Sequence, residues 1–334
     1  MGVKVAINGF GRIGRLVARV AANREDVDIV AVNDLGDLHT AAHLFKYDSI
    51  HGTFAGSVAA DGDNLQINGK SIKYLSERDP EKLPWKDLGV QVVVESTGVF
   101  RDREKAAKHL TAGASKVVVT APGKKMDLTI VMGVNQDKYT PDMAIISNAS
   151  CTTNCLAPVA KVLVEEFGIV KGLMNTIHSY TNDQRVLDLE HDDLRRARAA
   201  GVSLIPTTTG AASAIGLVIP ELDGKLDGVS IRVPTPDVSL LDLTVELEKP
   251  ATVKQLNEAF QKASQGSLKG ILKYTEEPLV SSDYRGEENS AVVDGLLTMM
   301  MGERMAKIIA WYDNEWGYSV RVVDVVHYVA TRGL

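Results

Sequence analysis

The residues best suited to do chemistry gather around Cys151. Three hydroxyl residues, Ser150, Thr152 and Thr153, flank it, and apolar residues then recur at helical spacing over 159–167. Ser150 is therefore predicted to cap a helix, with Cys151 in its first turn. Unpaired N–H groups and the positive end of the helix dipole favour an anion there, so the sequence predicts a thiolate nucleophile.

A buried structural cysteine is the alternative interpretation of Cys151, because cysteine is among the most buried residue types. The hydroxyl-rich helix start makes this alternative the weaker one. Cys155 lies one helical turn further along, faces an apolar segment, and is interpreted as structural. Two cysteines in a chain of 334 residues are typical of a reducing compartment, in which both remain thiols.

A glycine-rich turn near the N-terminus predicts a dinucleotide site. An apolar strand, 3–8, runs into Gly9–Gly14 (GFGRIG), which is predicted to open a helix that ends near residue 22. The three glycines permit a tight turn, close approach of a pyrophosphate and close helix–strand packing. A second strand, 27–33, ends at Asp34, 20 residues after the last glycine. A carboxylate there binds ribose hydroxyls and repels a 2′-phosphate, which favours NAD over NADP.

Strand and helix patterns alternate over residues 1–150, which predicts a doubly wound parallel sheet, that is, a Rossmann-type α/β domain. The strand at 90–95 ends in a small polar turn, and ligands bind at the carboxyl ends of such strands. From 151 to 316 the pattern is richer in strands with antiparallel-type connections. This predicts an α+β catalytic domain with a mostly antiparallel sheet.

Length and charge limit the possible classes of protein. A chain of 334 residues is long for one hydrophobic core, so two domains are expected. Its 37 basic and 43 acidic residues give a net charge of −6, which argues against nucleic acid or a membrane surface as the main partner. The sequence contains neither an apolar run of roughly 18 residues nor a signal-peptide pattern. We expect a soluble, cytoplasmic protein.

Several groups in the second half could bind an anion. The irregular stretch 182–204 contains four arginines within a net-acidic chain: Arg185, Arg195, Arg196 and Arg198. A solvated face is the ordinary explanation of such a run, but guanidinium groups also fork onto phosphate. The stretch 207–212 offers hydroxyl and N–H groups. Arg232 stands among apolar neighbours and needs a partner, for which a phosphate is suitable.

Three segments resemble the phosphorylating, NAD-dependent glyceraldehyde-3-phosphate dehydrogenases. They are 149–154 (ASCTTN), 7–15 (INGFGRIGR) and 311–318 (WYDNEWGY), and the likeness runs from about residue 3 to residue 330. The resemblance implies that the C-terminal helix, 317–334, packs back onto the NAD-binding domain. It also implies glyceraldehyde 3-phosphate and inorganic phosphate as substrates, NAD as cofactor, no metal, and a homotetramer.

The resemblance also implies roles for single residues. Cys151 is the nucleophile, and His178 is its base and activator, although the sequence alone does not place His178 beside the thiol. The substrate phosphate is expected to contact Thr181 and Arg232. The attacking phosphate is expected to contact Ser150, Thr152, Arg196, Thr209 and Gly210. The expected cofactor residues are Gly9, Gly11, Arg12, Ile13, Gly14, Asp34, Arg78, Thr120 and Asn314, the last of these holding the nicotinamide carboxamide.

These roles imply oxidation of an aldehyde through a hemithioacetal and a thioester on Cys151, as in glycolysis and gluconeogenesis. Three alternatives stay open: an erythrose-4-phosphate dehydrogenase of the same fold, a non-catalytic nucleotide- or nucleic-acid-binding protein, and a redox sensor that pairs Cys151 with Cys155. Glu190 stands where NAD-specific members usually have proline, so the strictness of NAD over NADP is also left open.

Overall fold

The computed structural model describes residues 2–212 and 214–334, which form two compact units. Unit 1 contains the chain up to Ile130 together with Gln136–Ala149 and Ser319–Leu334. Unit 2 contains Val131–Asn135 and Ser150–Tyr318. Among the described helices, none combines the length and the apolar character needed to cross a membrane.

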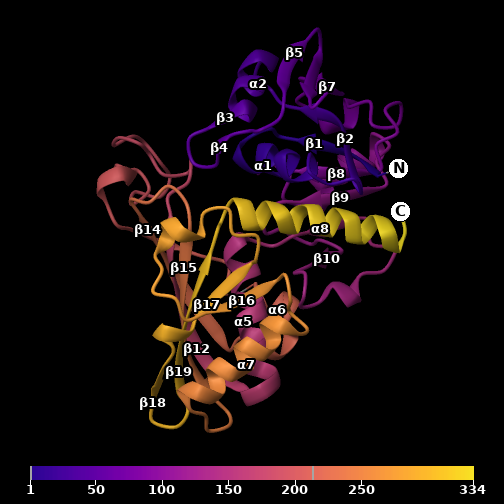
Figure 1. The fold of residues 1–334 in the computed structure, drawn as a ribbon. Coiled ribbons are helices and arrows are strands. Elements are labelled where there is room, and N and C mark those ends of the chain that lie inside the picture. Colours follow the sequence, from indigo (N-terminus) through magenta and orange to yellow (C-terminus); the bar gives the residue numbers. More distant parts are fainter. Residues whose placement is uncertain (1, 213) are drawn as a thin grey trace. The chain divides into compact units, whose positions relative to one another are not determined.

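Unit 1 is built on a nine-stranded sheet (Figure 1). From one edge to the other its strands are β10 (Leu128–Thr129), β11 (Ile145–Ser147), β9 (Lys116–Val119), β8 (Val92–Glu95), β1 (Val3–Asn8), β2 (Val27–Asn33), β7 (Lys70–Leu75), β6 (Asn64–Ile67) and β5 (Val58–Asp61). The strands from β10 to β7 are parallel, and β6 and β5 extend the sheet in antiparallel fashion. The predicted Rossmann-type architecture is therefore confirmed.

The helices of unit 1 connect these strands. They are α1 (Arg12–Ala21), α2 (Leu38–Lys46), α3 (Arg103–Ala106) and α4 (Lys108–Thr111), and a small two-stranded sheet, β3 (Tyr47–Asp48) with β4 (Gly52–Thr53), follows α2. The sequence predicts one helix over 103–112, whereas the structure has two short helices. The hydrogen bonding between them is of the 3₁₀ type, because the Leu110 N–H donates to the carbonyl of Ala107, three residues back, at 2.9 Å.

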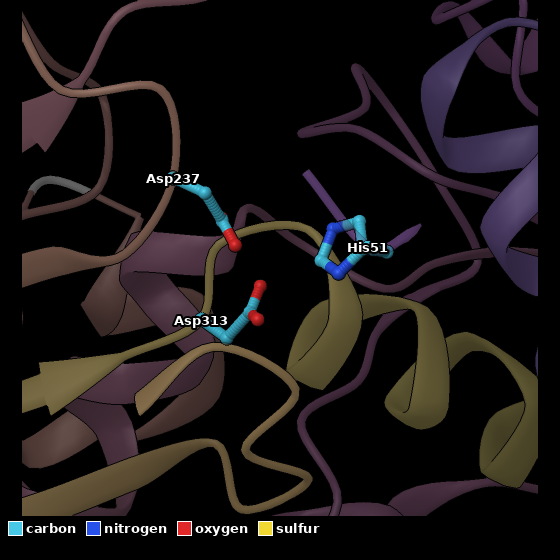
Figure 2. Close-up of side chains that lie close together, drawn as sticks. All are labelled: His51, Asp237 and Asp313. Atoms are coloured by element: carbon cyan, nitrogen blue, oxygen red, sulfur yellow. The ribbon is translucent and has the colours of Figure 1, made fainter. Parts of the chain in front are cut away.

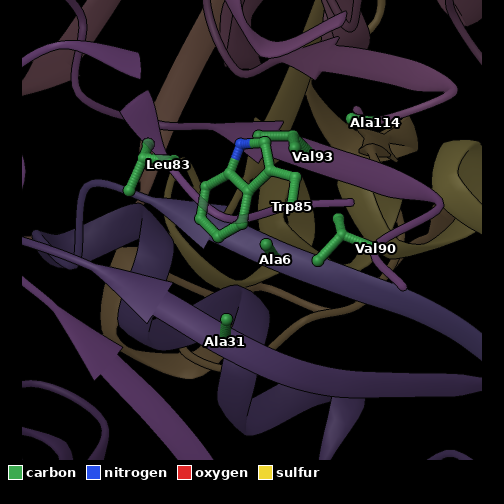
Figure 3. Packing of buried hydrophobic residues seen from close by; sticks show 7 residues of the cluster. All are labelled: Ala6, Ala31, Leu83, Trp85, Val90, Val93 and Ala114. Carbon is green, nitrogen blue, oxygen red and sulfur yellow. The ribbon is translucent and has the colours of Figure 1, made fainter. Parts of the chain in front are cut away.

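A tryptophan packs against side chains of three neighbouring strands in the core of unit 1. Trp85 is fully buried and packs with Ala6 of β1, Ala31 of β2 and Val93 of β8 (Figure 3). The alanines leave room for the indole ring at a close-packed sheet surface. The indole N–H still needs a partner inside this core, and a histidine supplies it.

The last helix, α8 (Trp316–Arg332), belongs to unit 1 from Ser319 onward. Four buried valines, at 322, 325, 326 and 329, recur at helical spacing and form its packed face. Polar contacts add to this packing: Asp324 pairs with Arg24 at 2.6 Å and His327 with Asp26 at 2.8 Å.

Unit 2 is built on an eight-stranded sheet. Its strands are, in order, β13 (Ile205–Thr208), β14 (Leu226–Val233), β12 (Ile169–Ser179), β15 (Ser239–Leu247), β19 (Met305–Tyr312), β17 (Ala291–Asp294) and β16 (Leu272–Thr275), and β18 (Met299–Met301) pairs with β19. Among these strand pairs, β12–β14 and β16–β17 are parallel and the others antiparallel. The prediction of a mostly antiparallel sheet is confirmed.

Three helices complete unit 2: α5 (Cys151–Phe167), α6 (Ile215–Val218) and α7 (Val253–Gln265). Helix α5 packs against α7 and against strands of the sheet, with most of its residues buried. It ends at Gly168, whose φ of +71° suits glycine and whose missing side chain leaves room for Glu248. The long buried helix gives its first residue, Cys151, a rigid base.

Candidate active site

The thiol of Cys151 lies at the start of α5, as the sequence predicts. Ser150 is the N-cap, and its Oγ accepts a hydrogen bond from the Thr153 N–H at 3.0 Å. Cys151 is half-buried, whereas Cys155 is fully buried. Cys151 therefore keeps part of its surface exposed, whereas Cys155 is packed in the core.

Two neighbouring strands bring distant residues to this thiol. Strands β12 and β14 pair in parallel, with His178 directly opposite Arg232. Nε2 of His178 lies 3.4 Å from Sγ of Cys151, across a sequence separation of 27 residues. Nη1 of Arg232 lies 2.7 Å from Nδ1 of His178 and donates to the carbonyl of Ser179 at 3.1 Å. The fold thus assembles a thiol, an imidazole and a guanidinium group.

The tautomer of His178 decides what the imidazole can do. When Nδ1 carries the proton, it donates to the Ser179 carbonyl at 2.7 Å, and Nε2 is left to accept the thiol proton. In the opposite tautomer Nδ1 accepts from Arg232 and Nε2 offers its proton to sulfur. Only the first tautomer can act as a general base toward Cys151.

Burial governs where the proton of this pair resides. Burial raises the pKa of the Cys151 thiol, and the charge of Arg232 and hydrogen bonds from Thr152 lower it only in part. Burial and Arg232 together lower the pKa of His178 to about 3, against the opposing hydrogen bond to Ser179. Burial therefore opposes the thiolate that the helix dipole predicts, while Arg232 and the hydrogen bonds from Thr152 favour it. The lowered pKa keeps the imidazole neutral, so Nε2 can accept a proton, and it also makes the ring a weaker base than a free histidine.

A buried tyrosine supports this pair. The hydroxyl of Tyr312 lies 2.9 Å from Oγ1 of Thr152 and 2.7 Å from Oγ1 of Thr176, and its ring packs edge-on against His178. The Thr152 hydroxyl is consequently engaged in the core. Sequence reasoning missed Tyr312, although the alternation along β19 places it on the inward face, where a tyrosine hydroxyl needs a partner.

Two buried carboxylates, Asp237 and Asp313, face each other in unit 2, with oxygens within 4.8 Å (Figure 2). Asp313 accepts hydrogen bonds from the backbone N–H groups of Glu315 and Trp316, at 2.9 and 2.7 Å, and of Gly286 at 2.8 Å. These bonds fix the turn that leads into α8.

Asn314, the predicted nicotinamide contact, lies in this turn and is 6% exposed. Its Oδ1 accepts a hydrogen bond from Oγ of Ser239 at 2.6 Å, and that Oγ accepts the N–H of Ser179 at 3.1 Å. The asparagine is thereby tied to the end of β12, next to His178.

Two of the predicted phosphate contacts already have partners within their own loop. Arg196 pairs with Asp183, and its Nε lies 3.2 Å from a carboxylate oxygen of Asp193. The N–H and hydroxyl of Thr181 both donate to Oε1 of Gln184, at 2.8 and 3.2 Å. These partners, which sequence reasoning missed, hold the two groups in place with bonds that an anion could exchange.

Thr209 and Gly210 follow β13. The Thr209 hydroxyl accepts the Ala211 N–H at 3.2 Å, and a side chain at Gly210 would meet nothing within 4 Å. The antiparallel register places Ile205, at the other end of β13, opposite Arg232. The strand pairing therefore brings His178 and Arg232 together but does not bring Thr209 to them.

The predicted dinucleotide turn in unit 1 has the expected backbone. Gly9 has a φ of +91°, and a Cβ on Gly14 would lie 2.1 Å from the carbonyl oxygen of Gly9, so only glycine fits either position. A Cβ on Gly11, the N-cap of α1, would meet nothing within 4 Å. The helix start is open on this side, and an open helix start suits a pyrophosphate.

Asp34 lies beside this turn with both oxygens fixed. Oδ2 accepts the N–H of Phe10 at 2.6 Å, and Oδ1 accepts the N–H of Gly36 at 2.8 Å. The carboxylate is thus oriented at the end of β2, where ribose hydroxyls bind in this class of fold. Together with the glycine turn, these residues fit a dinucleotide with an unmodified ribose.

The remaining predicted cofactor residues of unit 1 are Arg12, Ile13, Thr120 and Arg78. Arg12 and Ile13 form the first turn of α1, and the Arg12 guanidinium binds both oxygens of Asp48, at 2.8 and 3.3 Å. Thr120 donates its N–H to the Glu95 carbonyl at 2.9 Å, and Arg78 is exposed. The structure therefore places all four near strand or helix ends.

Comparison with known proteins identifies the family. Residues 3–103 match the NAD binding domain, and residues 150–314 the C-terminal domain, of glyceraldehyde 3-phosphate dehydrogenase. The chain belongs to the glyceraldehyde-3-phosphate dehydrogenase family. It is 62% identical to the glyceraldehyde-3-phosphate dehydrogenase of Geobacillus stearothermophilus over 100% of both chains. The resemblance inferred from the sequence is confirmed.

Two further relatives are also named as glyceraldehyde-3-phosphate dehydrogenases. Glyceraldehyde-3-phosphate dehydrogenase 1 of Bacillus subtilis is 59% identical over 100% of both chains. The chloroplastic glyceraldehyde-3-phosphate dehydrogenase GAPB of Arabidopsis thaliana is 57% identical over 99% of this chain and 75% of its own length.

The contact between His178 and Cys151 leads to a pH-dependent prediction. In His178→Asn, alkylation of Cys151 by iodoacetamide should begin at higher pH than in the wild type. A thiol whose pKa is raised by burial has then lost the neighbouring base that takes its proton. The measurement is the alkylation rate across a pH series, with the exposed His43 changed to Asn as control. Superimposable profiles for the wild type and His178→Asn would contradict the assignment.

Proposed function

We propose that the chain catalyses the NAD-dependent, phosphorylating oxidation of D-glyceraldehyde 3-phosphate to 1,3-bisphosphoglycerate, the step that serves glycolysis and, in reverse, gluconeogenesis. The observation that supports this best is the 3.4 Å contact between the Cys151 sulfur and His178 Nε2, with Arg232 beside it, in a member of this family. A protein that only bound nucleotides would need none of these three groups.

The first step is attack by sulfur on the aldehyde carbon. His178 accepts the thiol proton at Nε2 and returns it to the carbonyl oxygen as the carbon–sulfur bond forms, which gives a hemithioacetal. The required tautomer has the proton on Nδ1, where the Ser179 carbonyl accepts a hydrogen bond from it. Arg232 can only donate and competes for the same nitrogen until an anion binds its guanidinium group.

Oxidation follows when His178 removes the hemithioacetal hydroxyl proton. The glycine turn and Asp34 would hold NAD, which would supply the acceptor for the hydride that leaves the same carbon. The product on Cys151 is a thioester, and the protonated His178 is stabilised by the carbonyl of Ser179. Inorganic phosphate then attacks the thioester carbon, the carbon–sulfur bond breaks, and sulfur leaves as a thiolate that regains its proton from His178.

Two anion sites are needed for this sequence of steps. We assign the substrate phosphate to Arg232 and Thr181, and the attacking phosphate to Ser150, Thr152, Arg196, Thr209 and Gly210. The assignment of Arg232 is supported by its place opposite His178. That of Arg196 rests on the family resemblance, because its guanidinium group is paired with Asp183 and Asp193 and a phosphate would have to displace these carboxylates.

We also assign the two domains expected from the sequence, 1–150 for the cofactor and 151–316 for the catalytic steps. Cofactor contacts are assigned to the glycine turn, Asp34 and the positions near them, with Asn314 holding the carboxamide. The glycine turn and Asp34 support this assignment most directly.

The decisive experiment is an assay of NADH formation from glyceraldehyde 3-phosphate with and without inorganic phosphate. Cys151→Ser should abolish turnover and leave NAD binding intact, because the serine hydroxyl is not ionised there. His178→Asn should slow turnover by roughly 10²–10⁴-fold, the usual value of a general base. Cys155→Ala is the matched control and should retain activity. Turnover of erythrose 4-phosphate without need of phosphate would support the related dehydrogenase instead.

Asp34 supports the choice of NAD. Because both of its oxygens are held by backbone N–H groups, the carboxylate cannot turn away from a 2′-phosphate without breaking these bonds. Asp34→Gly should therefore relax discrimination against NADP, measured as the ratio of kcat/KM for the two cofactors. Asp34→Asn, which retains the shape without the charge, should act in the same direction. An unchanged ratio in both variants would rule out the ribose-carboxylate argument.

We further propose a cytoplasmic homotetramer. Exposed apolar side chains support association, namely Leu173 at 68%, Val229 at 52% and Met301 at 75% exposure on the sheet of unit 2, and Val186 at 86% in the arginine-rich loop. Light scattering should give four times the chain mass of 36.1 kDa. A mass equal to one chain would contradict the proposal.

A further inference from the structure

A buried polar cluster in unit 1 has no part in the chemistry described above. Its members are Asn8 at the end of β1, Asn33 at the end of β2, Glu95 at the end of β8, and the side chains of Trp85 and His109. Their exposed fractions lie between 0% and 4%. Burying so many polar groups costs free energy unless each finds a partner, so the pattern of donors and acceptors is informative.

The tryptophan fixes the tautomer of the histidine. Nε1 of Trp85 lies 3.0 Å from Nδ1 of His109, and an indole N–H can only donate. Nδ1 must therefore be the acceptor, which leaves the proton of the neutral ring on Nε2. That N–H lies 3.0 Å from Oε2 of Glu95 and donates to it.

Glu95 accepts from four donors. Nε2 of His109 and Nδ2 of Asn8 donate to Oε2, at 3.0 and 2.6 Å. The backbone N–H of Thr97 donates to Oε1 at 2.8 Å, and the Thr97 hydroxyl donates to the same oxygen. Both oxygens of Glu95 thus accept hydrogen bonds. Buried side chains donate to one oxygen and the exposed Thr97 turn donates to the other, and together they set the orientation of the carboxylate.

The cluster is connected to every segment in unit 1 that is assigned to the cofactor. Nδ2 of Asn33 donates to Oδ1 of Asn8 at 2.7 Å, and Oδ1 of Asn33 accepts the N–H of Glu77, the residue before Arg78, at 2.8 Å. Asp34 follows Asn33 directly. Thr120 donates to the main-chain carbonyl of Glu95.

The turn after Glu95 also touches the glycine turn itself. Oγ of Ser96 donates to the carbonyl of Gly9 at 2.6 Å. The two backbones approach so closely that a Cβ on Gly9 would lie 2.7 Å from the Thr97 nitrogen. A shift of the Thr97 turn would therefore displace the glycine turn.

We propose that His109 is a positioning residue for the dinucleotide: as the Nε2–H tautomer set by Trp85, it orients Glu95, which holds the Thr97 turn and the glycine turn in the geometry that receives the cofactor. This inference rests on the NAD site of the proposed function. Its physical content is preorganisation, because a turn already ordered by charge-assisted hydrogen bonds loses little entropy when the cofactor binds.

The polarity of the hydrogen bonds, rather than the volume of the ring, is what the proposal requires. Glutamine at position 109 can present a carbonyl to Trp85 and an N–H to Glu95, in the same order as the histidine tautomer. Phenylalanine fills the space, but it removes the acceptor of the Trp85 indole N–H and one of the two donors to Oε2 of Glu95. A role in packing alone would favour phenylalanine, since an apolar ring is readily buried.

The test compares His109→Gln and His109→Phe in the full chain. It uses two measurements that do not depend on catalytic turnover. Calorimetric titration gives the Kd for NAD, and hydrogen exchange without cofactor reports the Thr97 and Val99 amides. We expect His109→Phe to bind NAD about tenfold more weakly or worse, as an unpaired buried group implies, and to exchange these amides faster. His109→Gln should recover most of both properties. His43→Gln, on an exposed histidine, is the control.

A second variant keeps the proposal testable if His109→Phe does not fold. Thr97→Val removes one donor to Glu95 from an exposed position and should weaken NAD binding by a few-fold. In the double variant, if it folds, the loss of binding free energy for NAD should be smaller than the sum of the losses in Thr97→Val and His109→Phe, because both changes act through Glu95.

Wild-type affinity in His109→Phe, or in Thr97→Val if the former is unfolded, would overturn the proposal. Faster amide exchange with unchanged NAD affinity would overturn it as well. Failure of the wild type to oxidise the aldehyde, with the expected pattern of NAD affinities intact, would refute the proposed reaction and leave this inference standing.

Discussion

The contact between Cys151 and His178 is the interaction on which the rest of unit 2 depends. It requires a helix start and a strand end to meet within a few ångströms, and the helix and the sheet are both arranged to fix that meeting point. Helix α5 is buried along most of its length, and β12 lies between β14 and β15 in the sheet. Neither element can move without disturbing a packed core, so the thiol and the imidazole keep their separation.

The same burial that fixes the pair also determines its protonation. Removing sulfur and imidazole from water favours the neutral form of each group, which raises the pKa of the Cys151 thiol and lowers the pKa of His178. Arg232 acts in two ways: its charge favours the thiolate, and its hydrogen bond to Nδ1 competes with the Ser179 carbonyl for the same nitrogen. An anion that draws this guanidinium group away would therefore change the balance between the two tautomers of His178.

In unit 1 the structural requirement is different: several short turns must be held in one arrangement. Two carboxylates do this work, each through hydrogen bonds to groups outside its own strand. Asp34 takes backbone N–H groups at both oxygens, and Glu95 takes four donors. Fixed acceptors of this kind make the strand ends rigid before any ligand arrives. They also explain why unit 1 keeps polar side chains in its interior.

The sequence by itself determined a dinucleotide turn, a candidate thiol nucleophile and the class of each domain, because these follow from local patterns: the spacing of glycines from Gly9 to Gly14, the cap at Ser150, and the change from alternating strands and helices to a strand-rich pattern. The aldehyde chemistry followed from the resemblance to the family. It predicted the position of Cys151 in its helix for the same reason. Only the tertiary structure decided that His178 and Arg232 meet this thiol, that Tyr312 supports it, and that Trp85 sets the tautomer of His109. Those pairings depend on strand order and burial, which bring together residues far apart in the chain. Burial of the sulfur, which opposes the thiolate that the helix start predicts, is likewise a property of the packed structure and not of the neighbours of Cys151 in sequence.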